Sequence, residues 1–86
     1  MVTGKTSIQI KTGLHARPAA ELVKLSKGFQ SKILIRNDQK VANGTSIISL
    51  LSLGLISGSE LEIIIEGEDE TSALQAILDF FESLKD

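Results

Sequence analysis

Residues 60–66 place apolar side chains on one face of an extended chain. Leu61, Ile63 and Ile65 occupy alternate positions, and glutamates fill most of the positions between them. Because successive side chains of a β-strand point to opposite faces, this segment is predicted to bury one face and expose the other. Ile64 is the one apolar residue on the exposed face. A sheet with one solvated face is typically antiparallel, and its apolar face must be covered by other elements.

Three further segments are predicted to be strands, at residues 5–10, 31–36 and 40–42. In the first two, isoleucines recur at every second position, which is the period of a half-buried strand. Asn37 and Asp38 separate the last two segments, and both residue types favour tight turns. Residues 31–36 and 40–42 are therefore expected to form a hairpin.

Three segments have apolar residues at helical spacing. The first covers residues 16–27, where Pro18 fits only a first helical turn. Residues 47–53 could be strand or helix by periodicity alone, but a hydroxyl residue before them and Gly54 after them favour a short helix. The last helix is expected to follow an acidic run and to extend to about Leu84.

The predicted order is strand, helix, strand, strand, helix, strand, helix. It favours an α+β fold in which a four-stranded, mostly antiparallel sheet carries three helices on one face. A chain of 86 residues can build one modest hydrophobic core, so we expect a single domain over residues 1–86.

Composition argues against several classes of function. The chain has no cysteine and one histidine, so we expect no disulfide, no metal site and no bound cofactor. The net charge is −2 and phenylalanine is the only aromatic residue type, which argues against direct nucleic-acid binding. No apolar run reaches the roughly 20 residues that cross a bilayer, and residues 1–10 do not resemble a signal peptide. We therefore expect a cytoplasmic protein without membrane insertion.

The single histidine, His15, directly precedes the first predicted helix. A neutral imidazole nitrogen can attack phosphorus, and the N–H groups of Ala16 and Arg17 at the helix start could bind phosphoryl oxygens. The Arg17 side chain could offset part of the charge of about −2 that a phosphoryl group brings. The alternatives are that His15 only caps the helix or fills a gap, and that Arg17 is a solvated surface charge.

Two segments carry a resemblance to a known family. Residues 13–19, GLHARPA, resemble the active-site motif of HPr, the histidine-containing phosphocarrier of the bacterial phosphoenolpyruvate-dependent sugar phosphotransferase system. Residues 43–54, NGTSIISLLSLG, are similar to the second signature of that family, and the similarity covers essentially the whole chain. The resemblance implies an open-faced β-sandwich and a carrier with no enzymatic turnover of its own. It also implies that Enzyme I phosphorylates His15 on Nδ1 and that a IIA domain of a sugar permease then receives the group.

Ser46 resembles the serine that HPr kinase/phosphorylase modifies in some members of the family. That resemblance implies an alternative function, a regulatory module that acts through phospho-Ser46 as a corepressor with a catabolite control regulator. The simpler interpretation is an N-cap, whose loss costs about 1 kcal/mol. Thr45 stands where relatives often have a basic residue, which weakens the case for recognition by the kinase.

The resemblance further implies an exposed docking patch beside the histidine, formed by Ile47, Ile48 and Leu51 and fringed by Lys24 and Lys27. Core packing is the alternative interpretation of the apolar residues. Enzyme I and IIA domains would dock there, and we expect the carrier to be a monomer.

The motifs do not separate sugar uptake from a nitrogen-linked phosphotransferase chain. Leu34 and Ile64 are expected to share the exposed sheet face. We interpret them as ordinary surface apolar residues, with a sheet-mediated dimer as the alternative.

Overall fold

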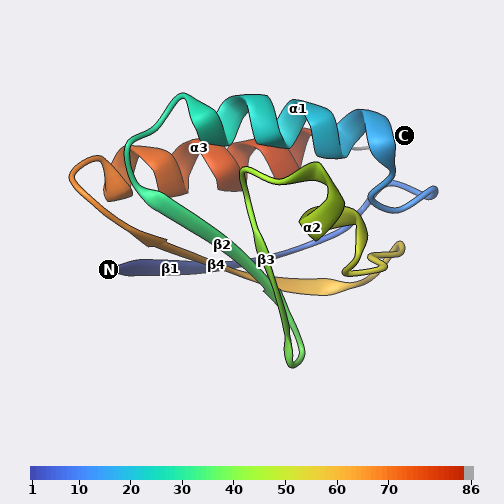
Figure 1. The fold of residues 1–86 in the computed structure, drawn as a ribbon. Coiled ribbons are helices and arrows are strands. Elements are labelled where there is room, and N and C mark those ends of the chain that lie inside the picture. Colours follow the sequence, from blue (N-terminus) through green and yellow to red (C-terminus); the bar gives the residue numbers. More distant parts are fainter. Residues whose placement is uncertain (85–86) are drawn as a thin grey trace.

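The computed structural model describes residues 1–84 and contains seven elements (Figure 1). They are β1 (Val2–Ser7), α1 (Ala16–Lys27), β2 (Lys32–Asn37), β3 (Lys40–Asn43), α2 (Ile47–Leu51), β4 (Glu60–Glu66) and α3 (Glu70–Ser83). This order confirms the predicted α+β arrangement. β2 and β3 form the predicted hairpin, but its turn residues are Asp38 and Gln39, because Asn37 still pairs with Lys40.

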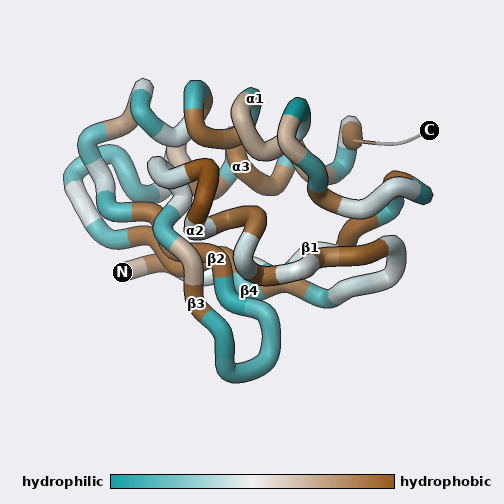
Figure 2. Tube along the Cα trace, turned by 45° about the vertical axis from the view of Figure 1, so that its right-hand side comes forward, coloured by the Kyte–Doolittle hydropathy of each residue, from teal (hydrophilic) through white to brown (hydrophobic). Residues whose placement is uncertain are grey.

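The four strands form one antiparallel sheet in the order β1-β4-β2-β3. β4 lies in the interior, where Ile63 pairs with Gly4 of β1 and with Ile35 of β2. The three helices cover one face of the sheet, and the hydrophobic segments of strands and helices meet between the two layers (Figures 1 and 2). The alternation read from residues 60–66 therefore matches the buried and exposed sides of β4.

The core is one hydrophobic cluster between the sheet and the helices. Its fully buried members with the largest side chains come from both layers: Phe81, Ile8, Leu22, Ile33, Ile35, Leu50, Ile63, Ile65 and Ile77. On the outer face, Leu34 pairs with Ile64 and both are only partly buried. An ion pair between Arg36 Nη2 and Glu62 Oε1, 2.5 Å apart, lies beside them.

The predicted boundaries of the first strand, residues 5–10, are wrong, because β1 runs from Val2–Ser7. Glycine is depleted in strands, so Gly4 gives no local signal for a strand that begins this early. In the structure the missing side chain is what allows α3 to approach β1. A Cβ atom at Gly4 would lie 3.1 Å from methyl carbons of both Leu74 and Leu78.

Smaller differences concern the other elements. The segment at residues 47–53 is helical as predicted, but the helix ends at Leu51 and Ser52 is its C-cap. Leu53 then turns into the core as the chain leaves the helix. β2 and β3 each end one residue beyond the predicted limit, at Asn37 and Asn43, because the hairpin pairs as far as those positions.

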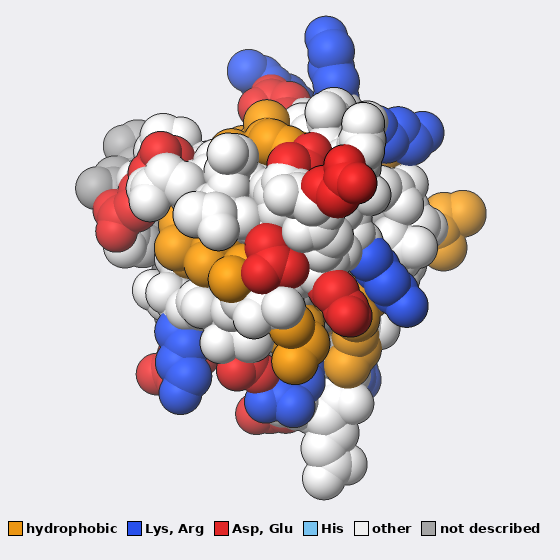
Figure 3. Space-filling model, turned by 90° about the vertical axis from the view of Figure 1, so that its left-hand side faces the viewer, with side chains coloured by type: hydrophobic (Ala, Val, Ile, Leu, Met, Phe, Trp, Pro, Cys, Tyr) orange, Lys and Arg blue, Asp and Glu red, His pale blue; other side chains and the backbone are white. Residues whose placement is uncertain are grey.

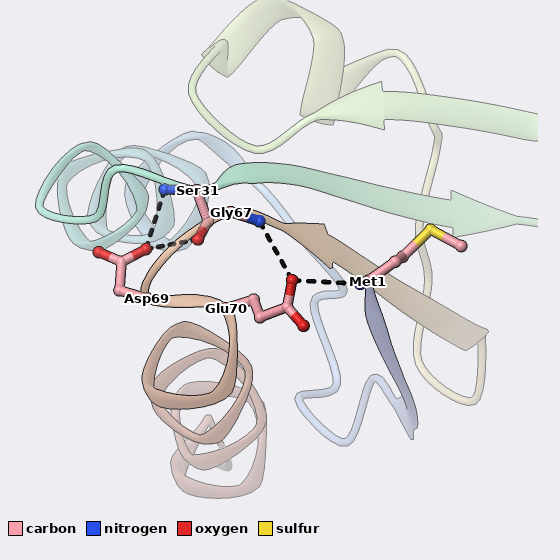
Figure 4. A network of polar contacts seen from close by, with 5 residues as sticks. All are labelled: Met1, Ser31, Gly67, Asp69 and Glu70. Carbon is pink, nitrogen blue, oxygen red and sulfur yellow. Dashed lines mark hydrogen bonds and ion pairs between the residues drawn. The ribbon is translucent and has the colours of Figure 1, made fainter.

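The acidic run before α3 ties two distant segments together (Figure 4). The Asp69 carboxylate accepts hydrogen bonds from the Ser31 hydroxyl and from the backbone N–H groups of Gln30 and Ser31, both at 2.9 Å. These bonds, led by that from the Ser31 hydroxyl, hold the pKa of Asp69 below its ordinary value. Asp69 thereby fastens the loop between α1 and β2 to the start of α3.

Glu70 makes a second set of contacts at the same end. Its Oε1 accepts from the Gly67 N–H at 3.2 Å and lies 3.2 Å from the Met1 amino nitrogen (Figure 4). The hydrogen bond from Gly67 and the interaction with the amino group lower the pKa of Glu70. Asp and Glu side chains are spread across this end of the molecule (Figure 3).

Candidate functional site

His15 is the N-cap residue of α1. Its backbone is extended, with φ −115° and ψ −173°, and its carbonyl oxygen accepts a hydrogen bond from the Ala19 N–H at 3.0 Å. The side chain is exposed and makes no capping hydrogen bond. The imidazole therefore neither caps the helix nor fills a gap in the core, and solvent and partners can reach it.

The loop before His15 is held by the segment that follows α2. The Leu14 N–H donates to the Leu55 carbonyl oxygen at 3.1 Å, and the Leu14 side chain is buried. Gly13 has φ +71°, and a Cβ atom at this position would lie 2.4 Å from the same Leu55 oxygen. Only glycine combines that backbone angle with so close an approach. The close approach of the two loops thus depends on a residue without a side chain.

The start of α1 presents few backbone donors. Ala16 and Arg17 occupy the first helical positions, where N–H groups have no intrahelical acceptor. Pro18 has no N–H, and its side chain is buried. The N–H of Ala19 is the first to bond back, to His15. The structure therefore brings the two predicted amides together at the open end of the helix, directly after the histidine.

The Arg17 side chain lies on the surface of α1. It is 86% exposed, and its Nε atom is 3.7 Å from Oε1 of Glu21, whose side chain is 57% exposed. The cation is thus one helical turn from a carboxylate and close in sequence to the imidazole. Sequence reasoning named Arg17 but missed Glu21, although the spacing of four residues is a recognised signal for a helical ion pair.

Ser46 is the N-cap of α2. Its Oγ accepts a hydrogen bond from the Ser49 N–H at 3.2 Å, so the capping interpretation is correct for the unmodified protein. The neighbouring hydroxyl of Thr45 donates instead to Asn43 Oδ1 at 2.7 Å. Ser46 is partly buried and Thr45 is engaged elsewhere, so one hydroxyl serves as the cap of this helix.

The apolar residues of α2 divide between core and surface. Leu50 is fully buried, whereas Ile47, Ile48 and Leu51 are exposed, and Ile48 is the most exposed of them at 83%. Core packing is therefore the wrong interpretation for these three residues, which we call the α2 patch. α2 packs beside α1, as Figure 1 shows.

Lys24 and Lys27 lie on the surface of α1, in the part that approaches its C-terminal end. The structure thus places both predicted lysines on the helix that packs against α2. The two lysines and the α2 patch therefore lie on neighbouring helices.

Ile56 is an exposed apolar residue that sequence reasoning missed. It is 68% exposed and follows Leu55, whose carbonyl oxygen holds the loop before His15. A Cβ atom at Gly13 would lie 2.9 Å from the Ile56 Cα atom, so the two loops touch. The available signal was an isoleucine between Gly54 and Gly58, outside any periodic segment.

Within residues 1–84, no group of three or more His, Cys, Asp or Glu side chains is placed to hold a metal ion. In the same part of the chain, no helix is both long enough and apolar enough to cross a membrane.

Comparison with known proteins identifies the family. Residues 2–83 match the family described as PTS HPr component phosphorylation site. The chain is 44% identical to the HPr-like protein Crh of Halalkalibacterium halodurans, over 95% of this chain and 98% of that protein. It is 41% identical to the phosphocarrier protein HPr of Borreliella burgdorferi, over the full length of both, and 39% identical to the phosphocarrier protein NPr of Escherichia coli, over 95% and 94%.

Solved structures agree with this assignment. HPr-C-His from Thermoanaerobacter tengcongensis superposes with a TM-score of 0.93 at 40% identity, over 98% of this chain and 94% of that one. The Crh protein of Bacillus subtilis, described as a dimer with a swapped domain, gives a TM-score of 0.79 at 38% identity, over 99% and 98%. With the fold, the placement of His15 and the full-length match all in agreement, this chain belongs to the HPr family of phosphocarrier proteins of the phosphotransferase system.

Proposed function

We propose that this chain carries a phosphoryl group on His15 between Enzyme I and a IIA domain of a sugar permease. The observation that carries the proposal is the exposed imidazole at the start of α1, which makes no capping hydrogen bond and directly precedes the N–H groups of Ala16 and Arg17. A side chain with a structural role would be buried or hydrogen-bonded. This one instead leaves both the ring and the helix start available to a ligand.

In the proposed step, the lone pair of the His15 Nδ1 atom forms a bond to phosphorus. The bond between phosphorus and the donor breaks at the same time, and the donor leaves with that electron pair. The N–H groups at the helix start bind phosphoryl oxygens, and the Arg17 guanidinium offsets part of their charge. Transfer to the next acceptor repeats the exchange in the opposite sense. The chain is thus a carrier with no turnover of its own.

The α2 patch is the proposed docking surface for both partners, with Lys24 and Lys27 as its charged rim. Ile48 projects most strongly from it, at 83% exposure. A carrier must bind and leave each partner quickly, and small apolar centres with polar rims suit short-lived complexes. Ile56 extends apolar surface to the loop beside His15 and is included in the proposal.

We further propose that residues 1–86 act as a single domain, as a monomer, in the cytoplasm. The swapped dimer described for the Crh protein of Bacillus subtilis provides the contrasting arrangement. Light scattering after size-exclusion chromatography tests the proposal. A mass near 9.2 kDa supports it, and twice that mass contradicts it.

The carrier function can be tested with labelled phosphoenolpyruvate and Enzyme I. We expect stoichiometric, acid-labile label on the wild-type protein and none on His15→Ala. Ser46→Ala should label as the wild type does, which controls for the other candidate site. Absence of label on the wild type, or equal labelling of the His15 variant, would contradict the proposal.

A regulatory role through Ser46 is the second candidate function. Ser46 caps α2 and directly precedes the α2 patch, so a phosphate there would change the charge of that surface. The similarity to Crh of Bacillus subtilis, described as a catabolite repression HPr, favours the same candidate. Incubation with ATP and HPr kinase/phosphorylase should then give acid-stable phosphate that Ser46→Ala lacks. If the wild type shows no such phosphate, the regulatory candidate is wrong.

A variant of the carrier proposal, which the motifs leave open, has a donor that belongs to a nitrogen-linked chain; the chain is also similar to the phosphocarrier protein NPr of Escherichia coli. Parallel assays with the sugar-linked and the nitrogen-linked Enzyme I distinguish the two. The faster phosphorylation at equal donor concentration identifies the branch.

A further inference from the structure

The Arg17 guanidinium already has an anionic neighbour before any phosphate arrives. Its Nε atom lies 3.7 Å from the Glu21 carboxylate, one turn further along α1. The first turn of the helix contains no acidic residue, so Glu21 is the first carboxylate that α1 presents after His15. The imidazole, the cation and the carboxylate thus follow one another on a single short stretch of helix.

This ion pair is weak enough for a phosphoryl group to replace Glu21 as the partner of Arg17. Its two side chains are 86% and 57% exposed, and water screens exposed pairs strongly. A separation of 3.7 Å also exceeds the 2.7–2.9 Å that is usual for a charge-assisted hydrogen bond. A phosphoryl group carries about twice the charge of a carboxylate and offers three acceptor oxygens, so it competes well for the same guanidinium.

We propose that Glu21 is a positioning residue that holds Arg17 along α1 while His15 is unmodified and yields it to the phosphoryl group after transfer. This inference rests on the proposed carrier function of His15. Formation of the N–P bond draws Arg17 away from Glu21, so part of the favourable contact with phosphate is offset by the contact that is lost. Glu21 thereby lowers the stability of the phosphorylated form and keeps the group transferable to the next acceptor.

The matched variants are Glu21→Gln and Glu68→Gln. Both remove one negative charge from an exposed side chain and keep its length. Glu68 lies in the loop between β4 and α3. Figure 1 shows this loop at the opposite end of the molecule from the start of α1. Both variants change the net charge equally. If only Glu21→Gln alters phosphorylation, the cause is therefore the local effect of Glu21.

The first measurement is the equilibrium between Enzyme I and the carrier, from the fraction of each that holds labelled phosphate. We expect Glu21→Gln to shift it toward the phosphorylated carrier by about twofold, the scale of an exposed helical pair. Salt near 1 M should remove most of the shift, because the Debye length is then about 3 Å and exposed charges that lie further apart are largely screened. Equal equilibria for Glu21→Gln and Glu68→Gln would overturn the inference while the carrier function stood.

The second measurement asks whether the effect passes through Arg17. In an Arg17→Gln background, Glu21→Gln should leave the equilibrium unchanged, because there is no guanidinium to release. If the shift persists undiminished, Glu21 acts on the phosphate directly and the inference is wrong. A general loss of structure would not produce this dependence on Arg17.

The third measurement does not need phosphoryl transfer. Inorganic phosphate is titrated into the unmodified protein, and the NMR signals of the His15 ring and the Arg17 Nε–H are followed. We expect about twofold tighter binding for Glu21→Gln than for Glu68→Gln. Absence of label on wild-type His15 refutes the carrier function, whereas equal phosphate affinities refute the role of Glu21, so the two failures are distinguishable.

Discussion

At the scale of single residues, the role of a charged side chain depends on the partner that the fold supplies. Asp69 occupies the N-cap position of α3 but makes no capping hydrogen bond there. Its carboxylate instead accepts hydrogen bonds from Gln30 and Ser31, nearly forty residues earlier in the chain. The hydrogen bonds favour the charged form, so protonation of Asp69 works against folding.

Asp69→Asn tests this linkage. The pKa of Asp69 is lowered in the folded state, so its charged form stabilises the folded protein. This contribution to the free energy of unfolding is complete at pH values above the ordinary pKa of 3.8. It is lost as the pH falls below 3.8 and through the pKa of the folded state. We expect wild-type stability to fall more steeply than that of Asp69→Asn in this acidic range. Urea unfolding at a series of pH values measures the difference, and Asp79→Asn is the control for charge. Parallel curves for wild type and Asp69→Asn would contradict the prediction.

Gly13→Ala tests the contact between the loop before His15 and the Leu55 carbonyl oxygen. The left-handed backbone alone costs a non-glycine residue roughly 1–2 kcal/mol, and here the new methyl group would also clash. Gly54→Ala is the control, because Gly54 has φ +62° but no atom within 4 Å of the added carbon. We expect Gly13→Ala to be the more destabilising in urea unfolding. Equal losses of stability in the two variants would show that the loops can move apart with little loss of free energy.

At the scale of elements, α2 depends on its surroundings. It contains five residues, which is far too few for a stable isolated helix. Three contacts hold it: the Ser46 cap, the bond from the Asn43 N–H to Ser49 Oγ at 2.9 Å, and the buried side chain of Leu50. The surface that the α2 patch presents is therefore only as well ordered as these contacts make it.

Substitutions at Ser46 measure the contribution of the cap. Ser46→Ala should lower the free energy of unfolding by about 1 kcal/mol, whereas Ser46→Asp should remain close to the wild type because aspartate caps equally well. Chemical denaturation of the three proteins provides the comparison. If alanine and aspartate destabilise the protein equally, the hydroxyl of Ser46 does not stabilise α2 as a cap.

At the scale of the whole molecule, the sheet has one buried face and one solvent-exposed face. Helices cover only one side, so neighbouring residues of β4 lie in different environments (Figure 1). Ile63 is fully buried, whereas Ile64 is partly exposed on the open face and pairs there with Leu34. Removal of the same methylene group from either residue should therefore have unequal effects.

Ile63→Val should cost about 1 kcal/mol, because it leaves a small cavity in a packed core. Ile64→Val should cost markedly less, since water fills the space that the lost group occupied. Thermal unfolding followed by circular dichroism compares the two. Similar losses for both variants would mean that the outer face is covered in solution, as in a sheet-mediated dimer.

Much of this architecture could be predicted from local pattern. The alternation in residues 60–66 and the helical spacing in residues 16–27 follow from backbone geometry, which repeats every two residues in a strand and every 3.6 in a helix. Together with similar patterns elsewhere, and with turn and capping residues for the hairpin and α2, they predicted the order of the elements and a one-sided sheet. The same local reasoning placed His15 before α1, because Pro18 marks a first helical turn.

The tertiary structure alone decided which distant groups meet. No periodicity shows that Gly4 belongs to a strand, that Asp69 bonds to Ser31, or that Ile56 stands exposed beside the loop of His15. These facts depend on how α3 packs on β1 and on how loops far apart in sequence come together. The sequence by itself determined the order of the elements and the position of His15 before α1, because local geometry sets both. The fold decided the neighbours of each side chain, because packing joins residues that no repeat along the chain relates.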